Sequence, residues 1–252
     1  NRLKININTE KEEIGPQDRF LNINFSSSYL FGAPAAGLKA EVNARLVQRE
    51  KKVSSFPGFS FVNQAMDYSP SEKNVFSGTL PADGKTEIEW ELPSFKGAPS
   101  ALKLLLDAAV FEKGGRATRG MSAIPVEPYA HYVGLQKPEM KYGYAQIGSH
   151  LNIQAILVDS DGNPISGRNL EYRLYKNERY WWWEYESYEN FRVRYKSDSN
   201  TELIDQGSLR SKSKPVSISV EPDSWGEYLI EVEDRDGHKA GFFFRASSWS
   251  NQ

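Results

Sequence analysis

The chain has 252 residues, a net charge of −2 and no cysteine. The near-neutral charge argues against a nucleic-acid partner, and the lack of cysteine excludes disulfides and thiolate metal ligands. No apolar stretch reaches the roughly 18–20 residues that a membrane-spanning helix needs, so we expect no direct membrane insertion by this chain. Because the first residue is Asn rather than Met, we expect a fragment of a longer protein that has lost its targeting segment.

Apolar and polar side chains alternate with a period of two along much of the chain, and helical periodicity is poor. Such alternation indicates strands with one buried and one solvated face. Together with Gly- and Pro-containing turns, it predicts an all-β chain of two tandem antiparallel β-sandwiches of the fibronectin or immunoglobulin kind. The alternating runs are 38–46, 86–92, 102–110, 151–157, 216–220 and 228–232.

A turn motif, G-x-P-x-x-G, occurs twice, 130 residues apart, and each copy precedes an alternating run. A second motif, Gly78-Thr79-Leu80 and Gly207-Ser208-Leu209, recurs at nearly the same spacing, 129 residues. Two motifs at similar offsets predict two copies of one domain. Neither G-x-P-x-x-G copy has the Lys-Ser/Thr end of a phosphate loop, so we interpret both as structural turns. Their defining residues are Gly32, Pro34, Gly37, Gly162, Pro164 and Gly167.

The domain boundary is predicted near Ile124–Pro128, where two prolines favour an extended connector. This divides the chain into domains 1–126 and 127–252. Two connections are long, one over about 51–74 and the other over about 177–189. Long connections in compact domains are often functional, so both are of interest.

The second long connection is rich in aromatic side chains and forms a candidate protein-interaction or protease-accessible loop. The alternative is that the rings fold back on their own sheet or on the first domain. The same cluster leaves open a second function, a carbohydrate-binding or cell-surface adhesion module. The residues are Arg179, Tyr180, Trp181, Trp182, Trp183, Tyr185 and Tyr188.

Histidines offer little for catalysis or metal binding. His131, His150 and His238 are scattered, so a zinc site is not expected. His238 follows the turn Asp236-Gly237 and is predicted to be a solvent-exposed hairpin residue. No G-x-S-x-G nucleophile motif is present.

Acidic residues are equally uninformative as catalysts. Glu87, Glu89 and Glu91 alternate with apolar residues and indicate a solvated strand face rather than a glycosidase pair. The run Asp159–Asn163 lacks the terminal Glu of a calcium loop and is interpreted as a turn. We therefore predict that the chain is not an enzyme and holds no metal or cofactor.

Several motifs together resemble bacterial α2-macroglobulins. The segment Tyr29–Leu38 is similar to the family's "YLYGAPA-G" sequence, and Pro57–Phe61 resembles the loop that follows it. The run Tyr180–Tyr188 resembles a Tyr/Trp-rich insertion in the next domain. Trp225–Tyr228 resembles the start of a "WG-Y-L-V" strand near that domain's end. The resemblance covers nearly the whole chain.

The resemblance implies two consecutive macroglobulin-like domains from the middle of such a protein, upstream of its bait and thioester regions. Family members are envelope proteins of bacterial defence, usually lipoproteins facing the periplasm, that inhibit endopeptidases by trapping them. The chain's implied partners are proteases, through the full-length parent, and neighbouring macroglobulin domains. Since the family's thioester needs a Cys, that chemistry is not expected here. Some bacterial members of the family lack the thioester altogether.

Overall fold

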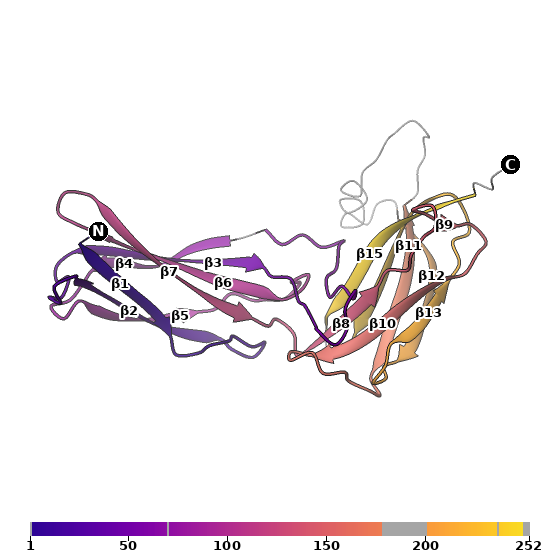
Figure 1. The fold of residues 1–252 in the computed structure, drawn as a ribbon, viewed down its shortest axis with the longest axis horizontal. Helices are drawn as coiled ribbons and strands as arrows, with labels where there is room; N and C mark the ends of the chain where they lie inside the picture. The colour runs from indigo at the N-terminus through magenta and orange to yellow at the C-terminus, as the bar shows by residue number, and fades with distance from the viewer. Residues whose placement is uncertain (1, 70, 178–200, 236, 249–252) are drawn as a thin grey trace. The chain divides into compact units, whose positions relative to one another are not determined.

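The computed structural model describes residues 2–69, 71–177, 201–235 and 237–248 (Figure 1). These residues form fifteen β-strands, and the described part of the chain contains no helix. The chain divides into two compact units, which we call the first and second unit. The first consists of residues 1–49 and 68–128, and the second of residues 50–67 and 129–252.

The first unit consists of two antiparallel sheets with strand orders β1-β2-β5 and β4-β3-β6-β7. Buried and exposed side chains alternate along its strands. In β5, Ile88 and Trp90 are buried, whereas Glu87, Glu89 and Glu91 are exposed, which confirms the predicted solvated face. The strands are β1 (Leu3–Thr9), β2 (Phe20–Tyr29), β3 (Lys39–Gln48), β4 (Ser71–Thr79), β5 (Lys85–Glu91), β6 (Leu102–Phe111) and β7 (Ala117–Val126).

The second unit repeats this arrangement. Its sheets have the orders β13-β10-β8 and β12-β11-β14-β15-β9, so β8, β10 and β13 correspond to β1, β2 and β5. The short β9 adds in parallel to β15, as Ile14 does to Val126 in the first unit. The strands are β8 (His131–Gln136), β9 (Ala145–Gln146), β10 (Leu151–Asp159), β11 (Asn169–Asn177), β12 (Thr201–Arg210), β13 (Val216–Val220), β14 (Gly226–Asp234) and β15 (Lys239–Ser247).

The predicted all-β sandwich fold is confirmed. Each of the six alternating runs falls on a strand, namely β3, β5, β6, β10, β13 or β14. The period-two pattern identifies strands such as β5, which has one face toward the opposite sheet and one toward solvent. The predicted solvated face is wrong for β14, where side chains on both faces are buried.

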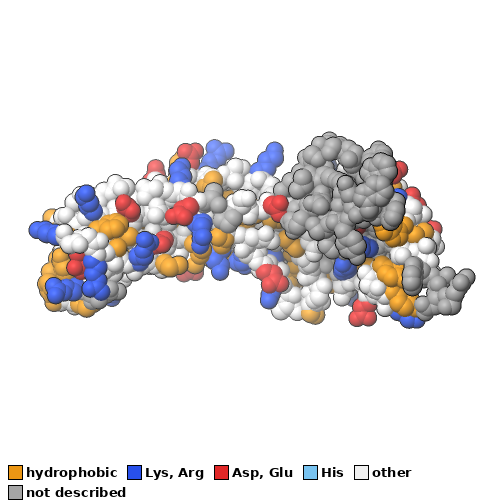
Figure 2. Space-filling model, turned by 90° about the horizontal axis from the view of Figure 1, so that it is seen from above, with side chains coloured by type: hydrophobic (Ala, Val, Ile, Leu, Met, Phe, Trp, Pro, Cys, Tyr) orange, Lys and Arg blue, Asp and Glu red, His pale blue; other side chains and the backbone are white. Residues whose placement is uncertain are grey.

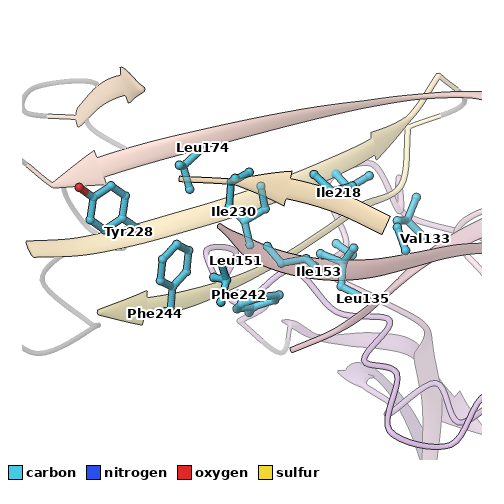
Figure 3. Close-up of a cluster of buried hydrophobic side chains, with 14 of the residues drawn as sticks. Val133, Leu135, Leu151, Ile153, Leu174, Ile218, Tyr228, Ile230, Phe242 and Phe244 are labelled. Atoms are coloured by element: carbon cyan, nitrogen blue, oxygen red, sulfur yellow. The ribbon is translucent and has the colours of Figure 1, made fainter. Parts of the chain in front are cut away.

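The core of the second unit lies between its two sheets (Figure 3). Side chains from the β13-β10-β8 sheet meet those from the larger sheet, where the Tyr228 and Phe244 rings stack with centroids 5.4 Å apart. Burial of each large apolar side chain contributes roughly 1.5–3 kcal/mol, so these contacts hold the sheets together. The labelled core residues are Val133, Leu135, Leu151, Ile153, Leu174, Ile218, Tyr228, Ile230, Phe242 and Phe244.

The two G-x-P-x-x-G turns share one backbone hydrogen-bond pattern. In the first copy, Tyr29 N–H donates to the Ala33 carbonyl, and Ala35 N–H donates to the Ser27 carbonyl. All four motif glycines have positive φ, between 74° and 96°, a region that other residues avoid. The second copy has the same two hydrogen bonds 130 residues further along the chain. Asp159 N–H donates to the Asn163 carbonyl, and Ile165 N–H donates to the Leu157 carbonyl.

The second repeated motif, by contrast, is not in register between the units. Gly37 donates its N–H to the Leu80 carbonyl, and Gly167 donates its N–H to the Ser211 carbonyl. Equivalent residues at this point are therefore 131 apart, not the 129 that separates the two G-[ST]-L motifs. The inference from that motif is wrong by two residues. A shift of two preserves the strand face on which each side chain lies.

The compact units differ from the predicted domains 1–126 and 127–252. Residues 50–67, which follow β3 in the chain, pack with the second unit, and we call them the docked segment. The expected connector near Pro125 belongs instead to β7, where the Pro125 carbonyl accepts the Ile14 N–H. Proline is tolerated there because β7 is the edge strand of its sheet. The units separate after Pro128, the last residue of the region where the boundary is predicted.

Gly32 and Gly162 occupy equivalent turn positions but have different surroundings. An added Cβ at Gly32 would meet no atom within 4 Å, whereas one at Gly162 would lie 2.8 Å from Val53 Cγ1. Both substitutions to Ala carry the strain of positive φ. We therefore expect Gly162→Ala to lower the free energy of unfolding by about 1 kcal/mol more than Gly32→Ala does.

Urea unfolding of the two single variants measures this difference. Gly162→Ala should then be repeated in a Val53→Ala background, where the missing methyl groups leave room for the new Cβ. The extra loss should disappear in that double-mutant cycle. Equal losses at Gly32 and Gly162 in the parent background would contradict the packing of Val53 on this turn.

Candidate functional site

The aromatic run from Arg179 to Tyr188 lies outside the described residues. Among the described residues, the face shown in Figure 2 has Lys/Arg and Asp/Glu side chains interspersed, without one continuous basic area. A nucleic acid would need such an area. The candidate site consists of polar side chains buried within the second unit.

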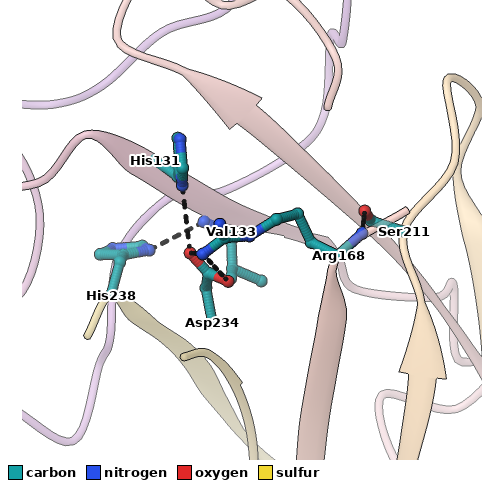
Figure 4. Close-up of polar contacts among 6 residues, drawn as sticks. All are labelled: His131, Val133, Arg168, Ser211, Asp234 and His238. Atoms are coloured by element: carbon teal, nitrogen blue, oxygen red, sulfur yellow. Dashed lines mark hydrogen bonds and ion pairs between the residues drawn. The ribbon is translucent and has the colours of Figure 1, made fainter. Parts of the chain in front are cut away.

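A buried polar cluster surrounds Asp234, at the end of β14 (Figure 4). The Asp234 side chain is 1 % exposed, and Arg168 Nη2 lies 3.4 Å from its Oδ1. His131 Nδ1 lies 3.4 Å from Asp234 Oδ2. His238 Nδ1 accepts the Val133 N–H at 2.8 Å. The cluster thus joins β8, the start of β11 and the β14–β15 hairpin.

The structure corrects the prediction for His238, which is only 1 % exposed. Its ring packs against the Tyr129 and Tyr132 rings, with centroid distances of 5.1 Å and 5.0 Å. The Asp-Gly turn signal predicts a hairpin correctly, with Gly237 at a φ of 107°. It carries no information about what covers that hairpin, and here two aromatic rings do.

The arrangement in this cluster is that of a structural network. Nδ1 of His238 is an acceptor for a backbone N–H, so it is engaged in holding β8 in place. The Arg168 N–H donates to Ser211 Oγ at 3.0 Å, which anchors the second G-x-P-x-x-G turn to the end of β12. Within the described ranges, no group of three or more His, Cys, Asp or Glu side chains could hold a metal ion.

Asp159, in the turn that superficially resembles a calcium loop, binds its own backbone. Its Oδ1 accepts the N–H of Asp161 at 2.9 Å and that of Asn163 at 2.8 Å. Burial alone would raise the pKa of Asp159, but hydrogen bonds from Asn163, Asp161 and Gly162 outweigh it and lower the pKa below 3.8. The carboxylate therefore stabilises the turn.

This lowered pKa predicts an acid-dependent loss of stability. Because the pKa of Asp159 is lower in the folded chain, its contribution is present above the ordinary value and is lost as pH falls through the folded value. Asp159→Asn should therefore make the urea midpoint less dependent on pH between about 2 and 5. Asp161→Asn, in the same turn, is the control. An unchanged pH dependence in Asp159→Asn would argue against the role of this carboxylate.

The run Trp225–Tyr228, which resembles the "WG-Y-L-V" strand start, contributes to a turn. The Tyr228 hydroxyl donates to Asp223 Oδ1 and lies 2.8 Å from the Ser224 carbonyl, closing the turn before β14. Burial raises the pKa of Tyr228 to about 12. Gly226 has a φ of 152°, which side chains rarely permit.

The docked segment completes the edges of both sheets in the second unit. Ser60 of the docked segment forms two backbone hydrogen bonds with Leu135 of β8. Each residue donates its N–H to the other's carbonyl at 2.9 Å. Gly241 of β15 donates its N–H to the Val62 carbonyl at 3.1 Å and accepts the Gln64 N–H at 2.9 Å. Edges that would otherwise be open are thereby paired.

Two side chains anchor the centre of the docked segment. The Phe61 side chain is 2 % exposed and packs against Gly134. A Cβ added at Gly134 would lie 2.4 Å from the Phe61 ring, so only glycine leaves room for it. Asn63 is fully buried, and its Nδ2 donates to Glu231 Oε2 at 2.6 Å. Its Oδ1 accepts the Ala65 N–H at 2.9 Å.

The beginning of the docked segment covers the second G-x-P-x-x-G turn. Lys51 Nζ donates to the Ser160 carbonyl and lies 4.7 Å from the centroid of the Tyr132 ring. Val53 packs on Gly162. The sequence predicts only a long connection here. No local pattern links it to a sheet more than sixty residues away in the chain.

Comparison with known proteins identifies two successive domains. The model of the bacterial alpha-2-macroglobulin MG5 domain matches residues 1–128. The model of bacterial macroglobulin domain 6 matches residues 134–249. Among the described residues, no helix is both long and apolar enough to cross a membrane.

Curated relatives match nearly the full chain. The chain is 26 % identical over 256 residues to an alpha-2-macroglobulin of Xylella fastidiosa, covering 99 % of this chain and 15 % of that protein. It is 22 % identical to the alpha-2-macroglobulin of Escherichia coli, covering 99 % of this chain and 16 % of that protein. The chain therefore spans about a sixth of the length of these relatives.

Solved structures show the same fold. Trypsin-activated alpha-2-macroglobulin from Escherichia coli matches with a TM-score of 0.69 at 21 % identity, over 100 % of this chain and 17 % of that one. Salmonella alpha-2-macroglobulin reacted with methylamine matches with a TM-score of 0.63 at 21 % identity, over 98 % of this chain and 17 % of that one. The chain belongs to the bacterial alpha-2-macroglobulin family and contains two consecutive macroglobulin domains that match domains 5 and 6.

Proposed function

We propose that this chain is a non-catalytic frame of two macroglobulin domains within a longer protease-trapping protein. The observation that carries the proposal is that domain models of bacterial alpha-2-macroglobulin match residues 1–128 and 134–249, in order. The polar residues support it, because the buried His238 and Asn63 and the turn residue Asp159 all bind backbone or neighbouring side chains of the fold. Such contacts suit rigid parts that hold a cleavable element elsewhere.

We further propose that the partners of the parent protein are proteases. The support is that structures of the Escherichia coli relative were determined after activation by trypsin and by porcine elastase. In this proposal the parent is a membrane-anchored lipoprotein of the periplasm or cell envelope, as in the family that the sequence resembles. This chain contributes the frame and not the covalent step, since it has no cysteine.

The test compares the parent protein with the 252-residue chain alone. The parent should slow the cleavage of a large protein substrate by trypsin or elastase. The 252-residue chain should neither inhibit these proteases nor release product from peptide, ester or polysaccharide substrates. Stoichiometric inhibition by the isolated chain would place the inhibitory site inside it and overturn the frame proposal.

The segment Arg179–Tyr188 remains a candidate protease-accessible loop, supported by its composition and its place between β11 and β12. Limited proteolysis with trypsin and chymotrypsin, with cut sites read by mass, tests it. We expect early cuts after Arg179 and the aromatic residues. If this segment survives as long as the strands do, it is not a protease-accessible loop.

A further inference from the structure

The docked segment contacts the second unit at three places that can be located in the first unit as well. It covers the turn at Gly162, pairs with the β15 edge at Gly241, and gives the Asn63 side chain to Glu231. Because the two units have the same strand order, each of these positions has a counterpart in the first unit. The counterparts show whether the first unit has an equivalent surface.

Strand register identifies the counterparts. Gly32 is equivalent to Gly162 through the shared turn hydrogen bonds. Opposite Val42 of β3 lies Ala108, which pairs with Gly120. The corresponding ladder in the second unit runs through Tyr172, Val232 and Ala240. At the next pair of each ladder, Asp107 lies opposite Met121, and Glu231 lies opposite Gly241. Met121 and Asp107 are therefore the counterparts of Gly241 and Glu231.

These counterparts are uncovered in the first unit. Met121 is 71 % exposed, and Leu30 and Phe31, at the tip of the first G-x-P-x-x-G turn, are 70 % and 81 % exposed. A Cβ added at Gly32 would meet nothing within 4 Å, whereas one added at the equivalent Gly162 would meet Val53. Met121, Leu30 and Phe31 thus expose large apolar side chains at the positions that correspond to covered ones in the second unit, which indicates an interaction surface.

Asp107 provides an independent observation. Its Oδ2 binds Arg119, but its Oδ1 atom is buried and has no hydrogen-bond partner among the described residues. A buried polar atom without a partner is costly and calls for a donor. In the second unit the equivalent carboxylate, Glu231, receives that donor from Asn63.

The backbone of β7 presents an open edge at the same place. The Pro125 carbonyl and the Glu127 N–H bond to Ile14 at one edge of the sheet. Alternate residues of a strand direct their backbone groups to the same edge, so Met121 faces this edge too. Along β7 the described residues pair with β6 and, at Val126, with Ile14. An open edge of this kind accepts an added strand.

We propose that this surface of the first unit, comprising Leu30, Phe31, Asp107 and Met121, binds the β3–β4 connection of a macroglobulin domain that precedes this chain in the longer protein. That occupant is indicated because the second unit is covered by the β3–β4 connection of the domain before it. The relatives are about six times longer than this chain, which leaves room for such a domain. Leu30 N–H donates to the Arg2 carbonyl, so an upstream domain would join the chain beside this surface.

The inference requires that the chain is part of a longer protein, but it does not depend on protease trapping. Hydrogen exchange of the 252-residue chain should be compared with that of a chain extended upstream by one domain. We expect the amides of β7 around Met121, and those of the turn at 30–34, to exchange about tenfold more slowly in the extended chain. The equivalent amides around Gly241 are the internal control and should not change.

Variants separate docking from a general gain in stability. In the extended chain, Phe31→Ser should restore fast exchange at Met121, whereas Phe20→Ser, at the other end of β2 and 51 % exposed, should not. Neither variant should change exchange in the 252-residue chain. Equal exchange around Met121 in the short and extended chains would overturn the proposal. So would protection in the short chain that increases with concentration, since it would show self-pairing instead.

Discussion

Replacing Phe61 by Ala should destabilise the second unit by about 3–5 kcal/mol, although Phe61 follows a strand of the first unit in the chain. The ring is 2 % exposed and fills the space over Gly134, where no side chain competes with it. Truncation leaves a cavity that the surrounding strands cannot fill without moving. The stability of the first unit should change little, because the docked segment packs with the second unit.

Hydrogen exchange at single-residue resolution distinguishes the two units in one experiment. Phe61→Ala should increase exchange in β8 and β15 and leave β2 and β6 protected. Phe20→Ala is the matched control, because Phe20 is 51 % exposed, and it should have little effect on either unit. A loss confined to the first unit would mean that residues 50–67 pack with the first unit.

Replacing His238 by Phe should cost about 1–3 kcal/mol in the second unit. The new ring can keep the aromatic contacts with Tyr129 and Tyr132. The phenyl ring cannot accept a hydrogen bond from the Val133 N–H. Because Val133 is buried, that N–H is left without its acceptor. The expected loss therefore reports the hydrogen bond rather than the packing.

Thermal and urea unfolding of matched variants measures this effect. His150→Phe is the control, since the His150 side chain is 71 % exposed and its replacement should be nearly neutral. Losses of similar size at His150 and His238 would show that the Val133–His238 hydrogen bond contributes nothing specific. His238→Gln offers an amide oxygen in place of Nδ1 and should recover part of the stability.

The strands and their faces were predictable because both depend on local order in the sequence. Glu87, Ile88 and Glu89 alternate, and a strand converts that alternation directly into one wet and one buried face. The G-x-P-x-x-G turns were visible for the same reason, since positive φ makes Gly the favoured residue at Gly32 and Gly162. The G-[ST]-L motif was misleading because a match of three common residues does not specify strand register.

The partner of each segment, in contrast, was not encoded locally. Nothing near Phe61 indicates that it packs over Gly134, and nothing near Asp236-Gly237 indicates that His238 lies under two tyrosine rings. Pro125 lies in β7 rather than in a connector, because proline suits both a linker and an edge strand. Only the arrangement of neighbouring strands distinguishes the two.

The all-β class, the two repeated sandwiches and the family follow from short-range patterns, because period-two burial, turn chemistry and short motifs are all read from adjacent residues. The packing of residues 50–67 with the second unit and the hydrogen bond between Asn63 and Glu231 are seen only in the folded chain. Such pairings join residues far apart in the chain. They form because burial and hydrogen bonding at a sheet edge outweigh the entropy of closing the long loop, a balance that local sequence does not contain.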